Sequence, residues 1–369
     1  MLEDEIENAQ RLVKTDAYQM SIGEVVNMYK DDEFIINPDF QRLFRWDIGQ
    51  KSKLIESLLL GIPLPSIFVF EKEDSKWELI DGLQRISTLL EFMGELKDPD
   101  TGQLEPPTAL VATKYLPSLH KTVWEKSERV ADFPVGDQNE LSRPQQLAIK
   151  RSRLSVEILK RPSDNATKYD LFQRLNAGGT AANAQELRNC IIIMVNSQYA
   201  AFMRNLANTE AFLTVVAASE DQIEKQRHME YVSRFLVLTY VDYDGKLDVE
   251  EFIDEGVVQL AMANETQQAG ATFEATFDLL NQAYGGNSLR RFQYGDPVGR
   301  VGLAAFEVIA VGIAKNILNI RSKANPVQYV RERIAEFWEA DMQGFFLPGL
   351  RGTVRLQRTV PFGTELFSS

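Results

Sequence analysis

Residues 79–90, LIDGLQRISTLL, place a carboxylate, a glycine, an amide and a guanidinium where an apolar strand is expected to run into an amphipathic helix. A helix that begins directly after a strand presents free backbone N–H groups and the positive end of its dipole to an anion. Gly82 has no Cβ, so the backbone can come close to a ligand. Arg85 offers a planar fork of donors to phosphate oxygens. The pattern indicates a phosphate site formed by Asp81, Gly82, Gln84 and Arg85, while a helix cap beside a surface arginine remains an open alternative.

A second polar cluster occupies residues 169–191, YDLFQRLNAGGTAANAQELRNCI. Its apolar residues predict a helix that breaks at 176–179, where two glycines permit positive φ angles and a concave nest of N–H groups. A second helix is expected to begin near Asn183. The polar residues around this break are Asp170, Gln173, Arg174, Asn176, Glu186, Arg188 and Asn189. A ligand site and an ordinary corner between two helices are both consistent with this pattern.

The composition is typical of a soluble globular protein, with 369 residues, 44% hydrophobic and 25% charged. The single cysteine excludes an intramolecular disulfide and fits a reducing cytoplasm. The acidic amino terminus lacks the pattern of a signal peptide. The longest apolar stretch, residues 301–314, contains Glu307 and is too short to span a bilayer. We therefore expect a cytoplasmic protein with no membrane partner.

Two histidines and one cysteine leave no zinc site of the usual kind and no HNH nuclease centre. Any bound metal would be a hard ion held by carboxylates and phosphates. The net charge of −13 gives no overall attraction for nucleic acid, so DNA contact would need a local basic patch. Residues 143–161 offer one, although a solvated helix and strand explain them as well. Its basic residues are Arg143, Lys150, Arg151, Arg153, Lys160 and Arg161.

Periodicity and turn residues predict an α+β chain. The polar region 1–33 is expected to hold one helix, near 21–29, capped by Ser21. Asp47 is expected to cap a helix that ends near Leu60, and strands are expected at 66–70, 77–80 and 154–159. The sequence beyond about 140 is mostly helical, and the tail 351–367 is expected to be a short strand or a loop. We predict an α/β domain over 1–140, with its site completed by 150–190, and a helical domain over 141–369.

Four motifs carry a resemblance to a known family. NPDFQRLFRW, LIESLLLGIPLPSIFVF, IDGLQRISTL and LFQRLNAGGTAANAQELRN occur in this order. From about residue 20 to 200 the chain resembles the GmrSD restriction-endonuclease amino-terminal domain family, whose usual DGQQR box is DGLQR here. That family resembles the ParB/sulfiredoxin fold, in which this box cradles nucleotide phosphates. LFQRLN looks like the Glu-Asn-x-x-Arg motif of ParB, with Asp170 where a metal-binding Glu would stand and Leu171 in place of the Asn.

The resemblance implies a nucleotide-binding, Mg²⁺-dependent NTP-hydrolysing sensor or regulator in a prokaryotic restriction or anti-phage system. In fused relatives an HNH nuclease follows this domain, and because the chain lacks the histidines for one, a separate nuclease or defence subunit is the expected partner. The implied catalytic set is Asp81, Gln84, Arg85, Asp170 and Glu186, with Asp81 and Asp170 holding the metal or orienting water. Glu186 is a candidate base or a structural partner of Arg188. The implied nucleotide-binding set is Gln41, Arg42, Gly82, Arg174, Asn176, Gly178, Gly179, Arg188 and Asn189.

A second hypothesis is a non-enzymatic protein that keeps the fold and binds DNA or a partner through residues 143–161. Leu83 and Leu171, which replace polar residues of the family motifs, favour this hypothesis. Asp81, Arg85, Asn176 and the two loop glycines favour nucleotide turnover. The sequence leaves both functions open.

Overall fold

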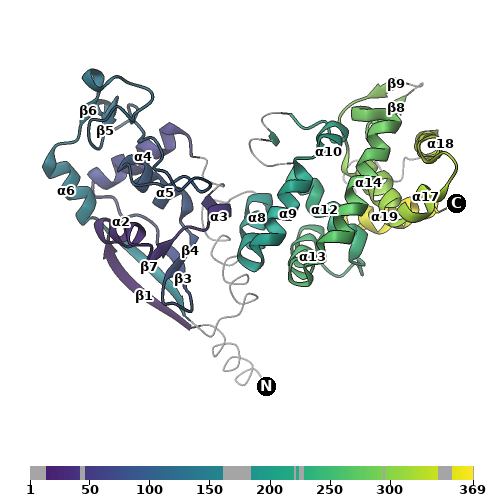
Figure 1. Cartoon of the computed structure of the whole chain (residues 1–369), viewed down its shortest axis with the longest axis horizontal. Coiled ribbons are helices and arrows are strands. Elements are labelled where there is room, and N and C mark those ends of the chain that lie inside the picture. Colours follow the sequence, from purple (N-terminus) through teal and green to yellow (C-terminus); the bar gives the residue numbers. More distant parts are fainter. Residues whose placement is uncertain are drawn as a thin grey trace. The chain divides into compact units, whose positions relative to one another are not determined.

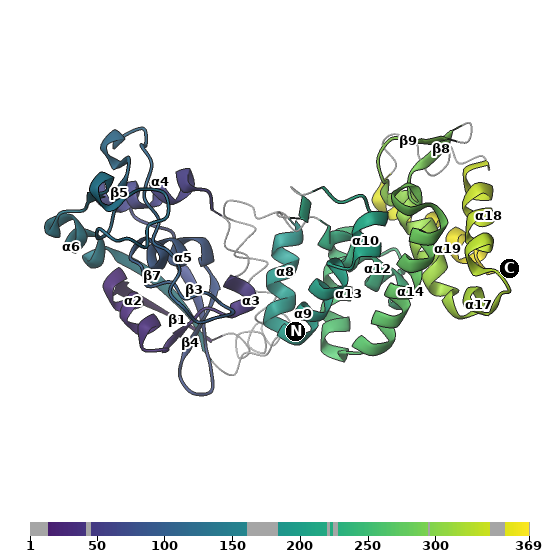
Figure 2. The ribbon, with the colours of Figure 1, turned by 45° about the horizontal axis from the view of Figure 1, so that its top comes forward.

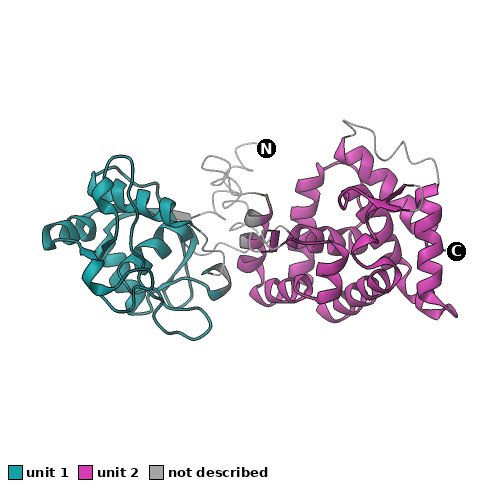
Figure 3. Cartoon of the chain, turned by 90° about the horizontal axis from the view of Figure 1, so that it is seen from above, with its two compact units in different colours: residues 1–180 teal, residues 181–369 magenta. Residues whose placement is uncertain are grey.

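The computed structural model describes residues 14–41, 46–160, 184–219, 222–223, 228–293, 296–339 and 351–368. The chain forms two compact units, residues 1–180 and 181–369 (Figure 3). The division falls later than the boundary expected near residue 140, because residues 143–160 contribute a helix and a strand to the first unit. The predicted α+β class is confirmed: a mixed sheet lies in the first unit, and the second is mostly helical.

The first unit contains a five-stranded sheet and the helices that follow its strands (Figure 1). The strands of this sheet are β1 (Lys14–Ser21), β2 (Phe34–Ile35), β3 (Ile67–Glu71), β4 (Trp77–Asp81) and β7 (Arg153–Lys160). Two further strands of the first unit, β5 (Thr122–Val123) and β6 (Asn139–Glu140), form a separate two-stranded sheet. Its α-helices are α2 (Ile22–Lys30), α3 (Pro38–Gln41), α4 (Ile48–Leu59), α5 (Leu83–Phe92) and α6 (Arg143–Arg151).

The five-stranded sheet has the order β1-β7-β3-β4-β2. β7 runs antiparallel to β1 and parallel to β3, while β4 runs antiparallel to β3 and parallel to β2. The apolar residues Ile67, Val69 and Val156 of neighbouring strands are fully buried. This core fixes the carboxyl end of β4, from which the DGLQR turn leaves.

Local capping chemistry sets where the helices begin. The Ser21 hydroxyl accepts a hydrogen bond from the Glu24 N–H at the start of α2. Asp47 and Gln50 form a reciprocal capping box at the start of α4. Both predicted caps are confirmed. β1, which pairs with β7 over eight residues, was not predicted within the polar region 1–33.

The second unit is an assembly of helices with one small hairpin (Figure 2). Its first helices are α8 (Ala184–Val195), α9 (Ser197–Ala207), α10 (Glu210–Val215), α12 (Met229–Tyr240), α13 (Val249–Ala263) and α14 (Thr266–Tyr284). The hairpin strands are β8 (Arg291–Gln293) and β9 (Asp296–Val298). The later elements are α15 (Leu303–Ala305), a π-helical segment (Phe306–Ala310), α16 (Val311–Lys315), α17 (Ile317–Ser322), α18 (Pro326–Glu339) and α19 (Gly352–Leu366).

The expectation of a strand or loop in the tail is wrong, because residues 352–366 form α19. Glu307, fully buried in the π-helical segment, accepts hydrogen bonds from Arg355 and from Thr359 of α19. Gly363 comes so close that a Cβ on it would lie 2.2 Å from the Val308 carbonyl oxygen. The tail is therefore a packed core helix. No helix in the described part of the chain is long and apolar enough to cross a membrane.

Candidate phosphate-binding site

The DGLQR residues form the turn between β4 and α5, as the sequence predicts. Asp81 ends β4, Gly82 occupies the N-cap position, and α5 begins at Leu83. The N-cap residue is a glycine and has no side chain to cap the amide hydrogens of the first turn. The Asp81 carboxylate pairs with Arg85 over 3.3 Å. A helix start directly after a strand suits an anion.

Gly82 is required by the fold itself. Its φ angle is +100°, in the left-handed region that favours glycine. A Cβ at this position would lie 2.5 Å from Cγ2 of Ile67 in β3. Close packing between the turn and β3 therefore explains why a glycine is needed here, without any ligand.

Arg85 joins the start of α5 to the segment that precedes β3. Its Nη1 donates to the Pro65 carbonyl and, over 3.0 Å, to the Ser66 carbonyl, and its Nη2 lies 3.3 Å from Oδ2 of Asp81. The Arg85 side chain is 14% exposed and that of Asp81 34%. Burial lowers the pKa of Arg85, and Asp81 opposes this shift. Since no partner in the described residues engages Nε, this donor remains for a ligand.

Gln84 connects the two polar stretches of the first unit. Its Oε1 accepts a hydrogen bond from the Trp46 N–H over 3.1 Å, directly before α4. Trp46, the last residue of the NPDFQRLFRW motif, therefore contacts the DGLQR box. Gln41, by contrast, donates from Nε2 to the carbonyl of Lys97, which lies beyond the other end of α5. Arg42 lies outside the described residues.

Leu83, the residue that replaces a glutamine of the family box, is 5% exposed. Its side chain therefore packs into the core next to the turn. Because position 83 faces the core, the change from glutamine to leucine does not alter the exposed side of the turn. The change is therefore compatible with an intact phosphate site.

The central part of the second polar cluster cannot be placed. Asp170, Arg174, Asn176, Gly178 and Gly179 lie outside the described residues. The backbone of Glu186 lies in α8, and the structure does not describe its side chain. Their catalytic, metal and nucleotide roles therefore stay predictions.

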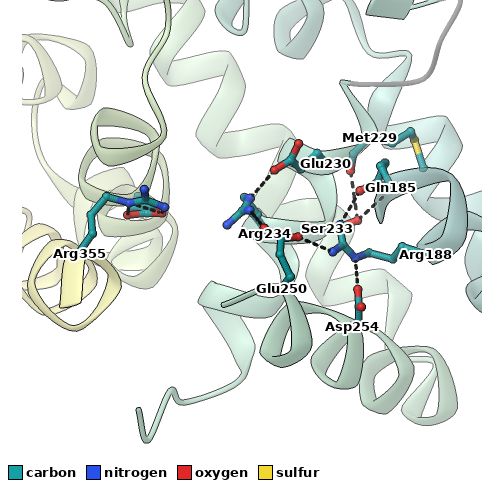
Figure 4. A network of polar contacts seen from close by, with 10 residues as sticks. Gln185, Arg188, Met229, Glu230, Ser233, Arg234, Glu250, Asp254 and Arg355 are labelled. Atoms are coloured by element: carbon teal, nitrogen blue, oxygen red, sulfur yellow. Dashed lines mark hydrogen bonds and ion pairs between the residues drawn. The ribbon is translucent and has the colours of Figure 1, made fainter. Parts of the chain in front are cut away.

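Arg188 lies in the second unit, inside a network of polar side chains from α8, α12 and α13 (Figure 4). The Arg188 side chain is 1% exposed. It donates from Nε to Asp254 over 2.7 Å, from Nη1 to Gln185 over 2.7 Å and from Nη2 to Glu250 over 3.0 Å. Asn189 accepts a hydrogen bond from Gln185 over 2.7 Å. Contact of Arg188 with a phosphate stays a prediction that would require this network to open.

The pKa values of two carboxylates in this network, Asp254 and Glu250, are shifted in opposite directions. Burial raises the pKa of Asp254, and Arg188 only partly offsets it. Burial also acts to raise the pKa of Glu250, but Arg234 and Arg188 outweigh it, and the net pKa is lowered. Arg234 supplies the second buried guanidinium, with Glu230 at 2.9 Å from its Nε. Sequence reasoning did not identify Arg234, Glu250 or Asp254, which lie far from Arg188 along the chain.

Residues 22–193 match the family model described as GmrSD restriction endonuclease, N-terminal domain. This part of the chain belongs to that family. The predicted family is thus confirmed, and it points to a protein of a restriction or defence system. No curated protein and no solved structure gives a significant match to the chain. The GmrSD N-terminal domain here includes the β4–α5 turn, the second polar cluster and most of α8.

The basic stretch 143–161 forms α6 and β7 of the GmrSD domain. Lys160 pairs with Asp16 over 2.8 Å, and the Lys150 ammonium lies 5.6 Å from the centre of the Trp124 ring. Arg161 lies outside the described residues. The exposed basic residues of this stretch that have no ion pair with any described residue are Arg143, Arg151 and Arg153. Of the six basic residues that the sequence offered for a DNA-binding patch, three are therefore exposed and without an ion pair among the described residues.

The donor set of the turn fits a phosphate better than it fits a free metal ion. Amide hydrogens of α5 and the Nε of Arg85 can approach phosphate oxygens. Among the described residues, no group of three or more histidine, cysteine, aspartate or glutamate side chains could hold a metal ion. Asp81 supplies one carboxylate. Mg²⁺ commonly takes one or two carboxylates, and phosphate oxygens and water complete its ligands.

Proposed function

We propose that the GmrSD domain binds a nucleoside triphosphate at the β4–α5 turn and hydrolyses it with Mg²⁺. Nucleotide turnover would regulate a restriction or anti-phage defence system in which a separate protein cuts the DNA. We also propose the ParB-like arrangement in which residues 169–191 supply the other side of the nucleotide site.

The observation that carries this proposal is the start of α5 at Gly82, directly after β4 and beside Arg85. Helix N–H groups, a partly exposed carboxylate on Asp81 and a guanidinium within one turn are the groups that phosphoryl transfer needs. The family match supports a role in DNA restriction, and the shortage of histidines favours a nuclease on another chain.

In this proposal the α5 amides bind a terminal phosphate, and Arg85 stabilises the negative charge that develops on its oxygens. Mg²⁺, when bound, would neutralise the phosphate oxygens. Asp81 and Asp170 would hold that ion or orient the attacking water. Gln84 positions the turn, since its side chain holds the backbone that leads into α4.

The test is equilibrium binding and phosphate release with ATP, GTP, CTP and UTP in the presence of Mg²⁺. We expect one nucleotide to bind and to be hydrolysed. Replacing Arg85 with lysine keeps the charge but loses the planar fork, so hydrolysis should fall about tenfold or more while the protein stays folded.

Arg129→Ala is the matched control, because Arg129 also donates to a backbone carbonyl of the first unit, that of Glu105, over 2.6 Å. It should leave nucleotide binding unchanged. If none of the four nucleotides binds, or if Arg85→Lys and Arg129→Ala behave alike, the proposal fails.

The exposed arginines of α6 and β7 favour a second candidate function. Here the protein binds DNA or a partner through Arg143, Arg151 and Arg153 and turns over no nucleotide. This hypothesis predicts full, salt-dependent DNA affinity without nucleotide. A requirement for nucleotide in the same assay would exclude it.

A further inference from the structure

The second unit is divided into an acidic part and a basic part. Residues 181–287 contain six Lys and Arg against sixteen Asp and Glu, whereas residues 288–369 contain eleven against seven. Within 288–339, which reaches the end of α18, there are eight basic and five acidic residues. One of these acids, Glu307, is fully buried and paired with Arg355, and Glu336 pairs with Arg333. The remaining acids are Asp296, Glu332 and Glu339. The basic part therefore has an excess of positive charge in a protein whose net charge is −13.

The basic part includes a cluster of aromatic and arginine side chains at the end of α14. The Tyr284 ring lies 5.1 Å from the Phe292 ring of β8 and 5.8 Å from the Arg331 guanidinium of α18. Arg331 also donates to the carbonyls of Ala283 and Gln282, the latter over 3.1 Å. In both ribbon views the hairpin lies beside α18 (Figures 1 and 2). These contacts hold the hairpin, the end of α14 and α18 together as one surface.

Two exposed arginines lie at the base of this hairpin. Arg291 begins β8 and pairs with Val298 of β9. Arg300 follows two residues after Val298, past Gly299, whose φ angle is +73°. Both side chains are exposed, and neither has an ion pair in the described part of the chain. Their charges are thus free to act on a partner.

We propose that this hairpin surface, formed by β8, β9 and α18, binds the phosphate backbone of DNA. Exposed arginines beside half-buried aromatic rings suit a nucleic acid, because guanidinium groups bind phosphates in two-point contacts and rings stack on bases or sugars. The acidic part of the same unit repels DNA, so it restricts contact to the hairpin surface. This inference goes beyond the proposed function, since it requires no nucleotide and uses residues outside the GmrSD domain.

The test compares two double charge reversals in the full chain, Arg291→Glu with Arg300→Glu, and Arg151→Glu with Arg153→Glu. Each changes the net charge by the same amount at exposed arginines. Binding of a fluorescent DNA duplex is measured by anisotropy over a range of salt concentrations. The hairpin variant should bind about tenfold more weakly, with the slope of log affinity against log salt smaller by about 2. The α6–β7 variant should bind like the wild type.

Four results would overturn the proposal: no DNA binding by the wild type, equal losses in both variants, a loss confined to the α6–β7 variant, or displacement of DNA by polyglutamate at equal charge. The last result would indicate an acidic protein partner. Thermal melting checks folding, and Arg291→Gln with Arg300→Gln provides a milder pair for which a reduced salt slope is still expected. Nucleotide binding should be unchanged in the hairpin variants, which separates this proposal from the proposed function.

Discussion

The β4–α5 turn of the first unit and the α8–α12–α13 core of the second each hold arginine against carboxylate, but they differ in compensating charge. At the turn, Arg85 faces one carboxylate and two uncharged carbonyls beside the positive end of a helix. In the core, Arg188 and Arg234 face Glu230, Glu250 and Asp254. A phosphate needs positive charge that is not already neutralised. The turn is formally neutral, and the start of α5 adds partial positive charge to it, whereas the core carries a formal charge of −1.

The difference teaches that a dense set of polar residues indicates an anion site only when its carboxylates do not outnumber its cations. The turn keeps Arg85 14% exposed and leaves its Nε without a partner in the described residues. The core satisfies all three nitrogens of Arg188 with described partners. We infer that the core network stabilises the helical unit and that the turn retains the capacity for binding.

The largest loss of stability is expected when the Arg188 network of the second unit is disrupted. Arg188→Ala leaves Asp254 and Glu250 without their guanidinium partner, and removal of one member of a buried pair costs about 3–5 kcal/mol. Urea unfolding measures the loss. Arg321→Ala, at an exposed arginine with no ion pair among the described residues, is the control and should change stability by less than about 0.5 kcal/mol.

Arg188→Ala also tests the role predicted from the sequence. A variant with wild-type stability but without nucleotide binding would place Arg188 at the phosphate and contradict a purely structural role. Loss of stability in the second unit, with nucleotide binding by the first unit kept, would support the structural role.

A smaller loss of stability is expected from a substitution at the β4–α5 turn. Gly82→Ala introduces a Cβ at a positive φ and against Ile67, so it should destabilise the protein by about 2–3 kcal/mol. Gly61→Ala is the matched control, since Gly61 has a φ of +72° but nothing within 4 Å of its ideal Cβ. It should cost about 1 kcal/mol. Equal losses in denaturant unfolding would show that packing against Ile67 contributes nothing.

Sequence reasoning succeeded where the determining interactions are local. Ser21 and Asp47 cap the helices that they were predicted to cap, and the DGLQR turn lies between a strand and a helix. These features depend on side-chain and backbone groups within a few residues, so a single sequence reveals them.

It failed where long-range partners decide the structure. β1 is polar and exposed over residues 16–19, and only its pairing with β7 makes it a strand. The tail contains Pro361, which argues against a helix, yet packing on Glu307 and Val308 holds α19. Likewise, the carboxylate partners of Arg188 lie about sixty residues away along the chain, where no spacing rule connects them.

The smallest expected effect concerns the pH dependence of the core. The lowered pKa of Glu250 means that the folded chain binds this proton less readily than the unfolded chain. Its contribution to stability is therefore present above the ordinary value of 4.5 and is lost as the pH falls through the lowered pKa. Because the Glu250 side chain is 52% exposed, solvent screening limits the loss in Glu250→Gln to about 1 kcal/mol near neutral pH. Its stability should also fall less steeply on acidification.

Asp254→Asn should have the opposite effect on that slope. The raised pKa of Asp254 makes the folded chain bind its proton more readily, so its contribution falls as the pH rises through the raised value. Removing this group removes a term that favours the folded state in acid, and stability should then fall more steeply. Urea unfolding of both variants at about pH 7 and about pH 4 measures the two slopes. If stability changes with pH by the same amount in both variants, the pKa values of Glu250 and Asp254 are not shifted in opposite directions. The electrostatic description of the core would then be wrong.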